Sequence, residues 1–259
     1  MSTTTAGEVI RANVQLHRAE APYYERIHEE IFNPIESVRI DHRLKRAVKA
    51  LGGVRGRALD FGAGTGNIAR RLSRMGFGVV AFELSREMIL QLKGKKEGGK
   101  IHAVLGERLP FRRGSFSLVC AFSVLHHVPD YVAVVAELAS LLEPGGVLYL
   151  DHEVDPQSPM LLPRREYDVY SVSASVLAEI RRRLTGFRAP HLDYSIADFH
   201  TKPEDHVEWA RIRSRLRDLG MVVLEERPYL MHSSWIPNPL FPFLSFWLAD
   251  LRYMIAARL

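Results

Sequence analysis

Three closely spaced glycines form the most specific pattern in the chain. Gly62, Gly64 and Gly66 follow an apolar, strand-like segment at 57–61, with Asp60 two places ahead of the first, and a helical pattern begins after them. Glycine permits positive φ and leaves no Cβ between the backbone and a ligand. The N-terminus of the next helix offers unpaired N–H groups and the positive end of a dipole. The pattern predicts a loop that holds a ligand against the backbone.

A carboxylate follows at the end of the next predicted strand, 78–84. Glu83 there can accept hydrogen bonds from both hydroxyls of a ribose. Dinucleotide sites space their glycines as G-x-G-x-x-G. Here the third glycine comes one place early, which disfavours a nicotinamide oxidoreductase. A turn without a ligand is also disfavoured, because clustered glycines are an entropically unfavourable way to build a plain turn.

This spacing resembles motif I of the class I methyltransferases that use S-adenosylmethionine (SAM). The likeness continues in the family's order over residues 55–153, through Gly106-Glu107-Arg108-Leu109-Pro110-Phe111, Ser123-Val124-Leu125-His126-His127-Val128-Pro129-Asp130 and Leu142-Glu143-Pro144-Gly145-Gly146. Each of these later stretches alone is weak evidence for the resemblance, but together, in this order, they are strong evidence. It resembles the group that methylates quinones, sterols and natural products. The resemblance implies methyl transfer from SAM to an O, N or C atom of a small, hydrophobic or lipid-like molecule, with S-adenosylhomocysteine (SAH) as product.

The resemblance also implies a set of cofactor-binding residues. In the family the glycine loop holds the methionine end of SAM, the acidic residue binds the ribose, and apolar residues flank the adenine and the sulfur. A tyrosine of a Tyr-acid pair near the N-terminus can close over the cofactor. The matching residues here are Tyr24, Asp60, Gly62, Gly64, Gly66, Glu83, Leu84, Met88, Gly106, Glu107, Ala121 and Phe122.

One position departs from the family pattern. The family usually has an aspartate near position 105 that reaches the adenine amino group, and this chain has Leu105. Two replacements stay open: the backbone around Gly106, or the carboxylate of Glu107 if the loop is shifted.

A hydroxyl acceptor also needs a general base. His152 follows the fifth predicted strand at the active edge of the sheet, and it is our candidate for the catalytic base, against a structural role in the pocket wall. His126 and His127 are interpreted first as pocket structure. No spaced set of carboxylates and histidines predicts a metal site.

The elements that must position these residues alternate along the chain. Strand-like and helical segments follow one another from residue 57 to 152, and the apolar strands are continuous, which indicates a parallel sheet covered on both faces. A helix at 206–219, a strand at 221–231 and a final edge strand at 253–258 complete the pattern. The expected fold class is α/β, a doubly wound, mostly parallel seven-stranded sheet of the Rossmann-like methyltransferase type.

The predicted organisation has a helical cap at 1–52 and a SAM-binding domain at 53–259. In the cap, Ile31, Ile35, Val38, Leu44 and Val48 recur at roughly helical spacing. An insertion at 154–201 is expected to contribute to an apolar substrate pocket. The aromatic tail at 235–247 could cover the core, line a lipid pocket or contact a membrane surface.

Composition leaves two rival functions open. The net charge of +5 and pI of about 9.4 suit an RNA methyltransferase, but the basic residues form small separate clusters, and no Asn/Asp-Pro-Pro-aromatic motif follows the fourth strand. The other rival is a protein that binds SAM without catalysis.

The sequence also predicts where the protein works. Cys120 is the only cysteine, the start of the chain has no apolar signal core, and no apolar stretch is long enough to span a bilayer. We therefore expect a soluble, cytoplasmic protein that acts on a small molecule.

Overall fold

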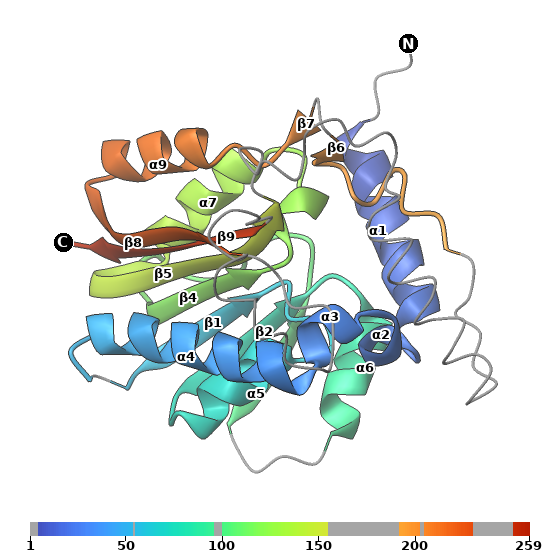
Figure 1. Ribbon diagram of the computed structural model, residues 1–259, viewed down its shortest axis with the longest axis horizontal. Helices are drawn as coiled ribbons and strands as arrows, with labels where there is room; N and C mark the ends of the chain where they lie inside the picture. The colour runs from blue at the N-terminus through green and yellow to red at the C-terminus, as the bar shows by residue number, and fades with distance from the viewer. Residues whose placement is uncertain (1–4, 54, 96–99, 155–191, 203–204, 230–250) are drawn as a thin grey trace, which may run out of the picture.

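The computed structural model describes residues 5–53, 55–95, 100–154, 192–202, 205–229 and 251–259. Within them one sheet of seven strands has the order β3-β2-β1-β4-β5-β9-β8 (Figure 1). All its neighbouring pairs are parallel except those of β9, which is antiparallel to both β5 and β8. The predicted fold class is therefore confirmed. The strands are β1 (Arg57–Phe61), β2 (Gly78–Glu83), β3 (Ile101–Leu105), β4 (Phe116–Phe122), β5 (Leu142–Val154), β8 (Met221–Tyr229) and β9 (Leu251–Arg258).

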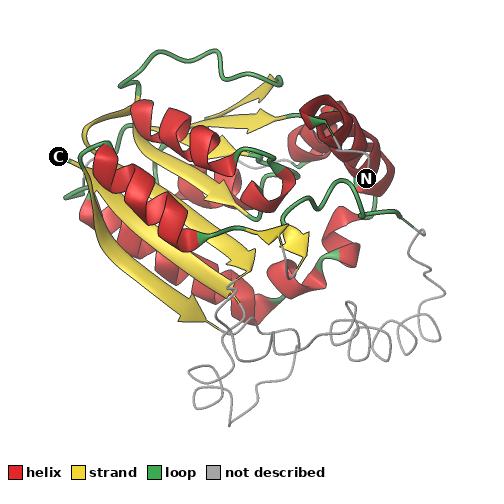
Figure 2. Cartoon of the chain, turned by 90° about the horizontal axis from the view of Figure 1, so that it is seen from above, coloured by secondary structure: helices red, strands yellow, loops and turns green. Residues whose placement is uncertain are grey.

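Helices cover both faces of this sheet (Figure 2). Successive strand residues point to opposite faces, so Ala58 joins one apolar core and Leu59 the other. The first core is closed by α4 (Pro34–Ala50) and α5 (Asn67–Arg74), and the second by α7 (Tyr131–Ser140) and α9 (Trp209–Asp218). A further helix, α6 (Arg86–Gly94), packs beside β2 and β3.

The N-terminal helices lie in two different places. The short helices α2 (Tyr24–Ile27) and α3 (Glu29–Phe32) lie with α1 (Ala6–Glu20) near the carboxyl ends of the parallel strands, whereas α4 runs along the sheet face (Figure 1). The division at residue 52 stays a prediction, and Ile40 and Leu44 of α4 share a core with the strands.

The buried face of α4 differs from the apolar pattern in the sequence. Val38 is 68% exposed, whereas Glu36 and Arg43 are buried. Charged residues can occupy this face because they pair with other buried polar groups. Nε of Arg43 donates to Oδ2 of Asp151 at 2.8 Å, and its guanidinium lies 4.3 Å from the ring centre of Tyr229. The hydroxyl of Tyr229 donates to the other oxygen of Asp151 at 2.7 Å.

The prediction that residues 253–258 form an edge strand is wrong. Strand β9 lies inside the sheet, between β5 and β8, and Met254, Ile255 and Ala256 are almost fully buried. The edge on this side is β8, which contains Pro228. Proline lacks an N–H group and is tolerated at a sheet edge. Pro228 was therefore the signal in the sequence that could have identified the edge strand.

Some predicted boundaries shift. The predicted helix at 206–219 begins at Trp209, because His206 belongs to a strand: β6 (Thr201–Lys202) and β7 (Asp205–His206) form a small antiparallel pair. Within the alternating segments, the apolar pattern from 131 to 142 predicts one helix, but α7 ends at Ser140 and β5 already begins at Leu142. Most of the predicted insertion and the whole aromatic tail lie outside the described residues. Among the described helices, none combines the length and apolar character needed to cross a membrane.

Candidate active site

A cavity of about 250 Å³ lies between the carboxyl ends of the central strands and the helices α1, α2 and α3. The strand order reverses between β1 and β4, and α/β folds bind ligands at such a point. Of the predicted cofactor-binding residues, Gly66 and Ala121 do not line the cavity. Those that do are Tyr24, Asp60, Gly62, Gly64, Glu83, Leu84, Met88, Gly106, Glu107 and Phe122.

The three glycines fill two different roles in the loop. All have positive φ, from 52° to 86°. A Cβ on Gly62 would lie 2.3 Å from Cγ2 of Val124, and one on Gly66 would lie 2.0 Å from Cδ1 of Leu92. On Gly64 the nearest atom to a Cβ would be in the Tyr24 ring, 4.0 Å away. Gly62 and Gly66 thus permit close packing of the loop, while Gly64 faces the cavity.

Asp60 caps the helix that follows the glycine loop. Gly66 is the N-cap residue of α5 and has no side chain to accept a hydrogen bond. Oδ2 of Asp60 instead accepts from the N–H of Ala69 at 2.8 Å. Burial, with a smaller contribution from the nearby Glu83, raises the pKa of Asp60 to about 8. The carboxyl group is therefore mostly protonated at neutral pH.

Glu83 joins two loops at the cavity wall. Its Oε2 accepts from the N–H of Gly64 at 2.7 Å, and its Oε1 accepts from Leu84 and Ser85 at 2.8 Å each. A carboxylate offers about four acceptor sites, so this one retains capacity for a ligand hydroxyl. Ser85 then caps α6 by accepting from the N–H of Met88 at 3.4 Å. The strand, the cap and the helix together fix Glu83, Leu84 and Met88 along one wall.

Helix α2 is tied down over the glycine loop by Glu25. The carboxylate accepts from the hydroxyl of Thr65 at 3.2 Å, from Arg70 at 3.3 Å and from Lys95. Burial alone would raise the pKa of Glu25, but the hydrogen bond and charge of Lys95 and the charge of Arg70 hold it below its usual value. The neighbouring Tyr24 is thereby held beside Gly64. The sequence indicated the Tyr-acid pair but not the partners of Glu25, because Lys95 resembled an ordinary surface lysine.

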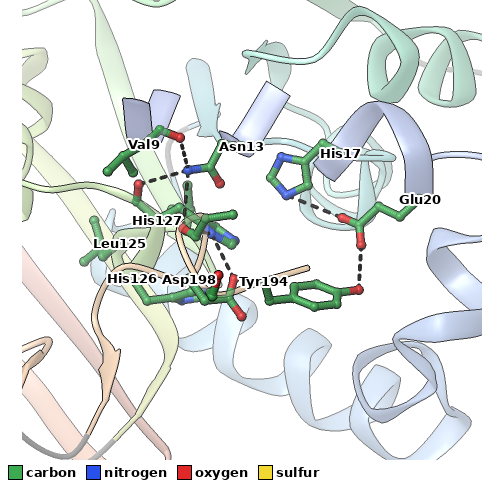
Figure 3. A network of polar contacts seen from close by, with 12 residues as sticks. Val9, Asn13, His17, Glu20, Leu125, His126, His127, Tyr194 and Asp198 are labelled. Atoms are coloured by element: carbon green, nitrogen blue, oxygen red, sulfur yellow. Dashed lines mark hydrogen bonds and ion pairs between the residues drawn. The ribbon is translucent and has the colours of Figure 1, made fainter. Parts of the chain in front are cut away.

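A second group of polar residues lies at another part of the cavity wall, where Asn13 and His17 of α1 meet His127 (Figure 3). His126 and His127 belong to the short 3-10 turn η1 (Leu125–His127). Nδ1 of His127 lies 3.0 Å from the carbonyl oxygen of Ala197. Burial and the neighbouring His126 and His17 lower the pKa of His127 well below its usual value. This imidazole is therefore neutral at pH 7.

The adjacent His126 has a different environment. Its Nδ1 lies 2.8 Å from Oε2 of the fully buried Glu153, which also accepts from the N–H groups of Val124 and Leu125 at 2.9 and 2.8 Å. Burial lowers the pKa of His126, but the charge and hydrogen bond of Glu153 outweigh it, so the pKa is raised. Glu153 therefore braces the turn that carries both histidines.

His126, His127 and Asp198 place ligand-type atoms within 4.8 Å of one another. Nδ1 of His127 lies 3.3 Å from Asp198 and also bonds to the carbonyl of Ala197, so a metal at that nitrogen would displace both contacts. The absence of a metal centre stays a prediction.

His152, the predicted base, does not line the cavity. It has a positive φ of 67°, and its ring stacks on Phe122 with 4.9 Å between the centres. Its Nδ1 lies 3.3 Å from the hydroxyl of Tyr229. Phe122 does line the cavity, so the geometry brings this phenylalanine, and not His152, to the ligand. The catalytic role of His152 stays a prediction.

The surroundings of Ala121 and Leu105 explain why neither side chain lines the cavity. Ala121 is fully buried in β4, paired with Phe61 and Leu150, and belongs to the core. Leu105 is 53% exposed, and the neighbouring Gly106 and Glu107 line the cavity in its place.

The sheet order, with β9 running against its neighbours, and the glycine loop facing Glu83 define the class I methyltransferase fold. Residues 59–150 match the family described as "Methyltransferase domain". This segment is therefore a methyltransferase domain, and its sheet order and glycine loop are those of the class I SAM-dependent type.

Curated relatives share parts of this chain. It is 31% identical over 123 residues to the ubiquinone biosynthesis O-methyltransferase of Xanthomonas axonopodis pv. citri, a match that covers 46% of this chain and 48% of that protein. It is 29% identical over 148 residues to the demethylmenaquinone methyltransferase of Chlorobaculum parvum, covering 54% and 61%. The chain therefore spans about half of the first relative's length and less than two thirds of the second's.

Solved structures share the fold over nearly the whole chain. The magnesium protoporphyrin IX methyltransferase of Synechocystis PCC 6803 with bound SAM has a TM-score of 0.57 at 16% identity, covering 99% of this chain and 100% of that one. A SAM-dependent methyltransferase from Mesorhizobium loti has a TM-score of 0.53 at 20% identity, covering 82% and 98%. At these identities the likeness concerns the fold alone.

Proposed function

We propose that this protein transfers the methyl group of SAM to a small, quinone-type or similarly hydrophobic molecule. The observation that carries the proposal is that the glycine loop and Glu83 face one cavity, within the segment that matches the methyltransferase family. The names of the two relatives, a ubiquinone biosynthesis O-methyltransferase and a demethylmenaquinone methyltransferase, support this substrate class over RNA.

The described residues fit SAM. Gly64 leaves an open cradle beside Tyr24, Glu83 offers acceptor capacity to a ribose, and Leu84 and Met88 provide an apolar wall for the adenine. When bound, SAM supplies an electrophilic methyl group on a sulfonium. The protein's task is then to hold the acceptor in line with that methyl group, which is mainly a matter of position.

The rest of the cavity fits an apolar acceptor. Ile10, Phe32, Val128, Pro129 and Val134 line it together with the polar group of Asn13, His17 and His127. An acceptor with a hydrophobic body and a few polar substituents would bury its apolar part there. The cytoplasmic location of the protein and its contact with a membrane surface stay predictions.

Calorimetric titration tests the cofactor. Wild-type protein is expected to bind SAM and SAH but not NAD. Glu83→Ala should weaken both affinities at least tenfold while thermal unfolding stays cooperative, because it removes the acceptor that faces the cavity. Glu137→Ala, an exposed carboxylate on α7, is the matched control and should bind as wild type.

The substrate class is tested separately with demethylated quinols and hydroxylated aromatic lipids, by following methylated product with mass spectrometry. Failure of the wild type to bind either SAM or SAH would refute the proposed function. Binding of both without methylation of any acceptor would favour the non-catalytic alternative.

A further inference from the structure

Asn13 lines the cavity and has a buried, unsatisfied side-chain oxygen. The side chain is 3% exposed, and its Nδ2 donates to the carbonyl oxygens of Val9, Ala197 and His127 at 3.0, 3.3 and 3.4 Å. These three partners can only accept, so the amide cannot be flipped. Oδ1 of Asn13 is consequently left with no hydrogen-bond partner among the described residues. A buried acceptor without a partner is costly, which points to a ligand that donates to it.

His127 supplies a second acceptor near Asn13. A carbonyl oxygen can only accept, so the contact of Nδ1 with Ala197 requires the proton to be on Nδ1. The other ring nitrogen, Nε2, then carries a lone pair. Asn13 donates to the backbone of His127, and both residues line the cavity. The rings of His17 and His127 pack edge to face, with their centres 5.2 Å apart (Figure 3).

We propose that Asn13 and His127 bind the hydroxyl-bearing end of the methyl acceptor, with His127 as the base that removes the hydroxyl proton. This inference rests on the proposed function and makes the reaction an O-methylation. The proton passes to Nε2 of His127, and an electron pair of the oxygen forms the bond to the methyl carbon. The carbon–sulfur bond breaks, and its electron pair stays on sulfur as the neutral thioether of SAH.

The charge balance around His127 suits a base. His17 of α1, His126 of η1 and Asp198 contact it directly. Behind them lie three further titratable groups: Glu20 of α1, His28 after α2 and Glu153 of β5. Glu153 is engaged by His126 and by the backbone of η1, while Glu20 is engaged by His17, His28 and Tyr194. His127 keeps a lowered pKa in this setting, so it stays able to accept a proton down to mildly acidic pH.

The test separates ligand binding from catalysis. Protein loaded with SAH would be titrated with catechol, its monomethyl ether guaiacol and its dimethyl ether veratrole, which share one ring and differ in their hydroxyl donors. We expect affinity to fall at least tenfold from catechol to veratrole, because veratrole leaves both acceptors unpaired. Equal binding of the three probes would overturn the proposal.

A variant tests the base. Asparagine at 127 keeps a donor near the place of Nδ1 and removes Nε2. His127→Asn is expected to bind SAH as wild type, to lower kcat/KM by roughly 10²- to 10⁴-fold and to abolish the acidic limb of its pH profile below pH 6.5. His102→Asn, on an exposed histidine of β3, is the matched control. Wild-type kcat/KM and an unchanged acidic limb in His127→Asn would overturn the assignment, whereas loss of SAH binding by the wild type would refute the proposed function itself.

Discussion

The N–H of Gly64 donates a 2.7 Å hydrogen bond to Oε2 of Glu83, so the glycine loop after β1 and the end of β2 are directly linked. The same carboxylate accepts from Leu84 and Ser85 through its other oxygen. The residue predicted to bind a ribose therefore also shapes the loop predicted to hold the methionine end. Loop geometry and ligand binding should respond together when either residue is changed.

The three glycines should differ in their tolerance of alanine. Gly62→Ala and Gly66→Ala place a Cβ within 2.3 and 2.0 Å of a neighbour, so both should lower stability by more than the roughly 1 kcal/mol of a left-handed alanine. Gly64→Ala meets no close atom and should cost about that much, while weakening SAM binding. Urea unfolding and SAM titration of the three variants check this ranking.

A compensating change provides the control for that ranking. Leu92→Ala removes the clashing methyl group, so Gly66→Ala should cost less stability in that background than in the wild type. If Gly64→Ala were the most destabilising of the three, the account of separate roles would be wrong.

Asp60 should make stability depend on pH. Its pKa is about 8 in the folded protein against an ordinary value of 3.8, so the native state holds a proton that the unfolded state has lost between about pH 4 and 8. The free energy of unfolding should therefore fall as pH rises through this window, by at most about 1.4 kcal/mol per pH unit from this group. Asp60→Asn keeps an oxygen for the N–H of Ala69 and should flatten the fall. Urea unfolding at several pH values measures it, and identical slopes in both proteins would contradict the assignment.

Arg43 should be among the least replaceable charged residues of the core. Arg43→Met leaves Asp151 buried without its cationic partner, which should cost about 3–5 kcal/mol. Arg46→Met, one turn along α4, removes a half-exposed pair with Glu225 and should cost at most about 1 kcal/mol. Urea unfolding compares the two, and a similar loss in both would mean that the buried network contributes little.

The hydrogen bonds of Glu25 to Thr65, Arg70 and Lys95 should affect SAM affinity more than the free energy of unfolding. Lys95→Met keeps the length of the side chain and removes its charge, loosening α2 above the glycine loop. A partly exposed pair is worth up to about 1 kcal/mol, so SAM affinity should fall about two- to fivefold. Lys93→Met, an exposed neighbour on α6, should bind normally. Unchanged SAM affinity in Lys95→Met would show that Glu25 does not help to hold Tyr24 in place.

Local sequence patterns predicted the central strands and the cavity residues Gly64 and Glu83, because these features depend on residues that are close together in the sequence. Gly64 and Glu83 are each followed by a helix within a few residues. An apolar strand followed by glycines can be recognised from a short stretch of sequence. Asn13 was not predicted, since a buried asparagine on an amphipathic helix becomes conspicuous only once the backbone of His127 and Ala197 is beside it. Arg43 and Lys95 were missed for the same reason: their partners lie 108 and 70 residues away.

The interior position of β9 has a consequence for the order in which the protein is assembled. Among the strands that the structure describes, β8 pairs only with β9. Because β9 follows it in the chain, β8 has no described neighbour in the sheet until residues 251–258 have been made. The β5 edge is exposed for the same interval during synthesis on the ribosome. The fold can therefore close only after translation has passed residue 258, and until then that edge is available to pair wrongly with another chain.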